Sequence, residues 1–146
     1  MIHRKPFSFG VITTIIVTLT MAASAGSSDQ QEVPFFEGLG DCHRKVTTTS
    51  PEAQRFFDQG LAFLYAFNHD EAVRSFKAAT ERDPACAMAW WGIATANGPH
   101  INNPMVDPEH AQVAWDAVQR ALTLAESGTP VEKALIRAAS KRFAMP

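Results

Sequence analysis

Apolar residues recur at helical spacing over most of the chain from residue 50 onward. Most of these apolar stretches begin with residues that start helices, either a side chain that caps the N-terminus or a proline in the first turn. The starts are Ser50-Pro51, Asn68 with Glu71 as a capping box, Asp107-Pro108, and Thr129-Pro130 with Glu132 as a second capping box. Together they predict an all-α fold of five helices, at about residues 50–66, 68–83, 87–97, 107–126 and from 129 onward.

The stretch from Ala53 to Pro84 has the pattern of one helix–turn–helix unit. Counted from Ala53, aromatic, small and proline residues occupy positions 4, 8, 11, 20, 24, 27 and 32: Phe56, Gly60, Phe63, Ala72, Phe76, Ala79 and Pro84. In this spacing the chain resembles the tetratricopeptide repeat family, whose unit of about 34 residues is a pair of antiparallel helices. The small residues stand where two helices would cross closely, and the aromatic residues would fill the space around the crossing. Position 7, usually leucine-like, is Gln59 here.

A second unit follows and is interrupted. Trp90, Ile93 and Ala94 take the positions of its first helix, which Gly98-Pro99 ends. Its second helix keeps the spacing only if about eight extra residues lie in a loop over residues 98–107. The fifth helix would open a third unit. We therefore expect about two and a half antiparallel repeats over residues 50–146, and, because arrays need roughly three or more units, a truncated piece of a longer protein.

The first 25 residues have the layout of a secretory signal peptide. Arg4 and Lys5 precede an uncharged, mostly apolar stretch, and Ala23-Ser24-Ala25 provides small residues for a signal peptidase. We expect cleavage after Ala25 and a secreted or periplasmic protein, with residues 26–49 as an N-terminal linker or extended segment. The alternative is an uncleaved membrane anchor, although the stretch is shorter than the ~20 apolar residues of a spanning helix.

Charge and motifs exclude several functions. The formal net charge is −2 and basic residues form no patch, so nucleic-acid binding is not expected. The chain has no glycine-rich phosphate loop, no Gly-x-Ser-x-Gly and no His-Glu-x-x-His. We predict no catalytic residues and no cofactor, while a catalytic part elsewhere in a longer enzyme stays open.

The family resemblance implies a binding face. In this family the first helix of each unit lines an inner groove, and the corresponding positions here are aromatic and apolar. We predict that they bind a peptide or protein segment, and the predicted contacts are Phe57, Leu61, Tyr65, Met88 and Trp91. An equally open alternative is that Phe35-Phe36 covers this face, since large exposed apolar patches are rare.

Cysteine and histidine residues support a second hypothesis. Cys42, His43, Cys86 and His100 are ligand types that copper or zinc prefers, so a metal-binding or redox-linked periplasmic protein is an alternative. Their spacing fits no known ligand signature. Cys42 and Cys86 could instead form a disulfide or stay separate thiols in an oxidising compartment. His100 lies in the expected loop, where neighbouring asparagines can form ordered turns.

Overall fold

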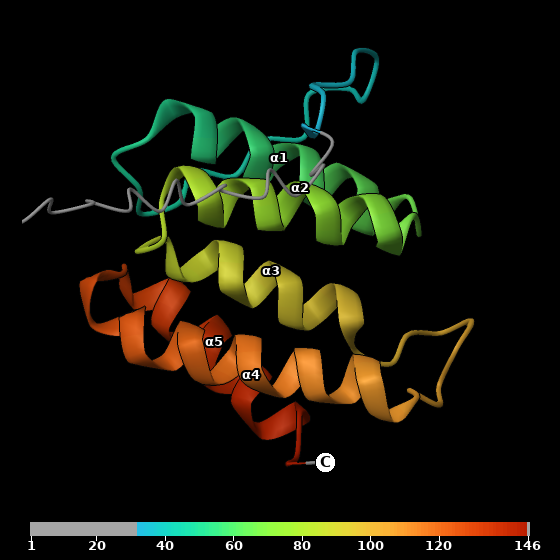
Figure 1. Ribbon diagram of the computed structural model, residues 1–146. Helices are drawn as coiled ribbons and strands as arrows, with labels where there is room; N and C mark the ends of the chain where they lie inside the picture. The colour runs from blue at the N-terminus through green and yellow to red at the C-terminus, as the bar shows by residue number, and fades with distance from the viewer. Residues whose placement is uncertain (1–31, 146) are drawn as a thin grey trace, which may run out of the picture. The chain divides into compact units, whose positions relative to one another are not determined.

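The computed structural model describes residues 32–145, which form five α-helices (Figure 1). The helices are α1 (Pro51–Tyr65), α2 (His69–Arg82), α3 (Ala87–Asn97), α4 (Pro108–Leu124) and α5 (Pro130–Arg142). A 3-10 turn, Ala125–Ser127, follows α4. Residues 32–145 contain no β-strand, only an isolated bridge between His100 and Asn103. The predicted all-α class and its five helices are confirmed.

Two sequence predictions concern the N-terminus of the chain and its relation to the membrane. The signal peptide and the alternative anchor concern residues 1–25, which lie outside the described residues. Within residues 32–145, no helix is both long and apolar enough to cross a membrane.

Local capping explains where four of the helices begin. The side chains of Ser50 and Asp107 each accept a backbone hydrogen bond, and Thr129 and Glu132 form the complete predicted capping box. The box predicted for α2 is only half formed. Asn68 accepts from the Glu71 N–H at 3.4 Å, but the Glu71 carboxylate pairs with Arg74 at 2.7 Å instead of turning back to Asn68. That part of the prediction is wrong, because an arginine one turn ahead competes for the carboxylate.

The helices pack mainly on their neighbours in sequence. α1 packs on α2, α2 on α3, and α3 on α4, while α5 contacts both α3 and α4. Figure 1 shows α1 to α4 lying side by side in that order, with α5 against α4. The connection between α1 and α2 is three residues long, which makes these helices a hairpin. The longer connection predicted between the third and fourth helices is present at residues 98–107.

One aromatic ring joins three of the helices. Phe76 of α2 is fully buried, and its ring lies against two glycines on other helices. A Cβ atom on Gly60 of α1 would come within 2.7 Å of this ring, and one on Gly92 of α3 within 2.5 Å. Phe57 adds a ring 5.6 Å away between centroids. The absence of side chains at the two glycines therefore lets α1 and α3 approach the same ring.

Candidate partner-binding face

The five residues predicted to contact a partner do not share one environment. Phe57, Leu61 and Met88 are 0%, 4% and 1% exposed and belong to the main apolar core. This corrects the expectation that their side chains face a partner, since in this structure they stabilise helix packing instead. Trp91 is half-buried, and Tyr65, at the end of α1, is 68% exposed. Only these two keep surface that a partner could contact.

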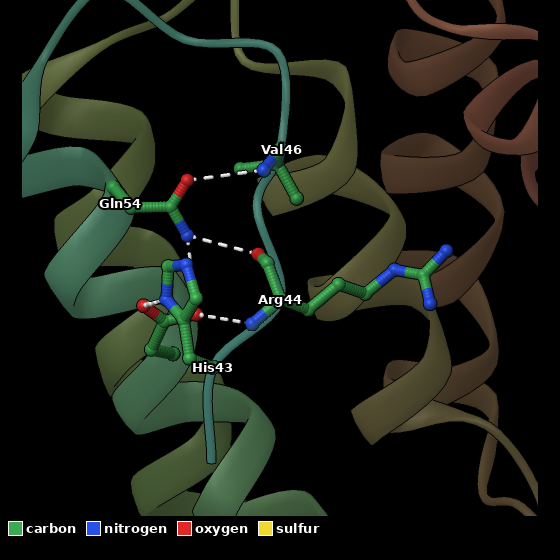
Figure 2. A network of polar contacts seen from close by, with 5 residues as sticks. His43, Arg44, Val46 and Gln54 are labelled. Atoms are coloured by element: carbon green, nitrogen blue, oxygen red, sulfur yellow. Dashed lines mark hydrogen bonds and ion pairs between the residues drawn. The ribbon is translucent and has the colours of Figure 1, made fainter. Parts of the chain in front are cut away.

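A segment that precedes α1 lies over part of this region. Residues 43–48, which we call the strap, contain no helix or strand and run alongside α1 (Figure 2). Val46 of the strap is 4% exposed and belongs to the same apolar core as Phe57 and Met88. The part of the predicted N-terminal linker just before α1 is therefore fixed to the helices.

Two polar side chains of α1 hold the backbone of the strap (Figure 2). Gln54 accepts from the Val46 N–H at 3.0 Å and donates to the Arg44 carbonyl at 2.9 Å. Asp58 accepts from the Arg44 N–H at 3.0 Å, and its other oxygen lies 2.7 Å from His43 Nδ1. Gln54 also donates to Asp58 at 3.1 Å, which fixes both side chains. Because strap numbers rise as α1 numbers fall, the strap runs antiparallel to α1.

A buried glutamate ties the strap to α5. The N–H and the hydroxyl of Thr47 each donate to the Glu132 carboxylate at 2.7 Å, and the Thr129 N–H donates at 2.6 Å. Glu132 is 3% exposed. Burial by itself raises the pKa of this carboxyl, but the hydrogen bonds from Thr47 and Thr129 outweigh burial and hold the pKa below its usual value. Glu132 is therefore an anion at neutral pH, and the strap bonds directly to it.

The alternative cover, Phe35-Phe36, takes a different place from the one expected. The Phe35 ring stacks on Phe56 with centroids 4.2 Å apart, and the Phe36 ring meets Phe63 edge-on at 5.3 Å. Arg55 lies 3.8 Å above the Phe35 ring. These aromatic residues thus pack on the side of α1 that carries Phe56 and Phe63, rather than on Phe57 and Leu61.

Gln59, the departure from the repeat pattern, has a clear structural reason. Its side chain accepts from the Phe36 N–H at 2.9 Å and donates to the Pro34 carbonyl at 3.1 Å and to Ser75 at 3.1 Å. Gln59 is only 6% exposed, so its polar atoms need these partners. A glutamine at a position that is usually leucine-like was the sequence signal that this side of α1 binds the backbone of another segment, here Pro34 and Phe36.

The four candidate metal ligands have separate surroundings. Cys86 is buried at the start of α3, Cys42 is half-buried, His43 pairs with Asp58, and the His100 ring stacks on His69. Over residues 32–145, no group of three or more histidine, cysteine or acidic residues is placed to hold a metal ion. Both cysteines are free thiols, and burial raises the pKa of the Cys86 thiol. Of the cysteine alternatives, the structure contains the separate thiols.

Sequence reasoning missed a histidine pair between α2 and the 98–107 loop. The rings of His69 and His100 stack with centroids 4.1 Å apart, beside a pocket of about 400 Å³. Both ring nitrogens of His69 and Nδ1 of His100 are buried without a hydrogen-bond partner among the described residues. Burial and then the neighbouring His100 lower the pKa of His69, so the ring is neutral at pH 7. Nothing in the spacing of these two residues indicated the contact.

Comparison of the chain with protein-family models, with curated proteins and with solved structures finds no match.

Proposed function

We propose that this chain is an exported helical-repeat module of the tetratricopeptide type, which binds an extended segment of a protein partner. The packing of the helices supports the repeat register. Gly60 stands at the small-residue position of the pattern and Phe76 at an aromatic one, and the two lie against each other across the α1–α2 hairpin. Gly92 of α3 meets the same ring, as expected where one unit stacks on the next.

The strap is the observation that carries this proposal. It is a short non-helical segment whose backbone N–H and C=O groups are bound by side chains of α1. Binding an extended peptide through its main chain requires such donors and acceptors on the receptor surface. The face of α1 therefore already binds one peptide segment, the chain's own.

Tyr65 and Trp91 are the proposed contacts of the partner. Both lie on helices that would line the inner groove, and both retain exposed aromatic surface. Tyrosine and tryptophan combine a large apolar body with a hydrogen-bonding group, which suits residues that are exposed in the free protein and buried in a complex. The neighbouring Leu64 is half-buried and extends this surface.

Site-specific photo-crosslinking tests the proposal. A photoreactive phenylalanine is placed at Tyr65, at Trp91 or, as the matched control, at the exposed Asp116 of α4. We expect the same crosslinked partner from the first two positions and no such adduct from the third, in extract of the cell envelope. Equal adducts from all three positions would show unspecific adhesion. Adducts from Asp116 alone would place the binding surface on α4 and end this assignment.

A further inference from the structure

We infer that the strap is an internal stand-in for the partner, and that the surface beneath it binds an extended segment of the same chemistry once the strap is displaced. The segment that fits has a small β-branched apolar residue followed directly by threonine or serine. This inference rests on the proposed function, since it names the partner and the regulation of the same face.

The first requirement on such a segment concerns its backbone. At the Arg44 position both the N–H and the C=O are bound, and at the Val46 position the N–H is bound. Gln54 and Asp58 provide these bonds and hold each other at 3.1 Å, so the surface stays arranged when the strap leaves. Proline is excluded at either position because it has no N–H to donate.

The second requirement concerns two side chains. Val46 is the only buried residue among 43–48, and its place in the apolar core accepts a small apolar group. The next residue must donate, because Glu132 is a buried anion that receives both the N–H and the hydroxyl of Thr47. An acidic side chain there would meet this carboxylate and is rejected by like-charge repulsion. Arg44 and Lys45 are exposed, so these positions select little.

Polar bonds, including one from the Thr48 hydroxyl to Asp83, hold the strap more than apolar packing does. Apart from Val46, its side chains are exposed or half-buried, so few apolar contacts oppose its release. A cavity of about 600 Å³ lies along one flank, lined by strap residues and by Asp83, Ala85, Ser127 and Thr129. A partner with larger side chains at the positions of Thr48 and Thr49 can fill this space.

The test measures binding of a fluorescent peptide to the full chain by fluorescence anisotropy. The peptide has the sequence of residues 44–49. A double variant of the chain, Val46→Gly with Thr47→Gly, weakens the strap and substitutes none of the α1 and α5 side chains that bind it. We expect this variant to bind the peptide at least about tenfold more tightly than the unaltered chain, because the strap no longer competes. Peptides with Val46→Gly or Thr47→Asp should lose this gain. Gln54→Ala in the weakened chain should lose it too.

A second variant keeps the test decisive. Thr47→Val preserves side-chain volume and removes only the hydroxyl bond to Glu132, so it replaces the double variant if circular dichroism shows lost helix. A folded strap variant that gains no peptide binding overturns the inference. If crosslinks at Tyr65 identify a partner whose affinity is unchanged by strap weakening, the inference fails and the proposed function stands. If the peptide binds the strap variant but Tyr65 and Trp91 yield no partner, the surface beneath the strap binds peptides, and Tyr65 and Trp91 are not contacts of the partner.

Discussion

Replacing Gly92 by alanine should reveal the packing of α1, α2 and α3 around Phe76. An added Cβ would lie 2.5 Å from the Phe76 ring, far inside van der Waals contact. The ring is fully buried, and the glycine backbones of both α1 and α3 contact it, so it has little room to move. We expect Gly92→Ala to cost about 1–3 kcal/mol of unfolding free energy through overpacking.

The same substitution should have the opposite sign when the ring is absent. Phe76→Ala alone should cost about 3–5 kcal/mol, because it removes a buried aromatic side chain and leaves a cavity. With that cavity present, the methyl group of Gly92→Ala has space, and alanine is favoured over glycine within a helix by about 0.5–1 kcal/mol. Gly92→Ala should therefore stabilise the Phe76→Ala chain, with a coupling energy of about 1.5–4 kcal/mol between the two sites.

The unaltered chain, the two single variants and the double variant form a double-mutant cycle, which urea unfolding followed by circular dichroism measures. All four proteins are compared at one concentration of a stabilising osmolyte, so that the least stable of them is folded at the start. Asp116→Ala, on the exposed face of α4, is the control and should change stability by no more than about 0.5 kcal/mol. An equal cost of Gly92→Ala in both backgrounds would mean that Phe76 does not lie between the two helices. The proposed repeat register would then be wrong.

Two further predictions concern Glu132 and export. The folded-state pKa of Glu132 is lowered, so its ionised form stabilises the fold above the usual pKa of about 4.3, and that contribution is lost as pH falls through the lower folded value. Glu132→Gln should flatten the fall in melting temperature between about pH 5 and pH 3, whereas an unchanged acid profile would show that another carboxylate dominates. The protein recovered from an envelope fraction should begin at Gly26 by intact mass. Retention of Met1 together with extraction only by detergent would favour the membrane anchor.

Local sequence determined the helices of this protein. The start of α5 depends on Thr129, Pro130 and Glu132, which interact within one turn, and the end of α3 on Gly98. Such signals can be recognised in the sequence because each partner lies within about four residues of the other. The repeat pattern that the chain resembles placed Gly60 and Phe76 near one helix crossing, and in the structure the two lie against each other.

The tertiary structure alone decided which of these faces are exposed. Phe57 and Met88 fit the inner-groove pattern as well as Tyr65 does, yet they are buried. Glu132 shows the reason. Its role in capping α5 followed from its neighbours, whereas its two bonds to Thr47 join residues 85 positions apart. No local pattern encodes such a contact, because it exists only when the packed helices bring the start of α5 to the segment that precedes α1.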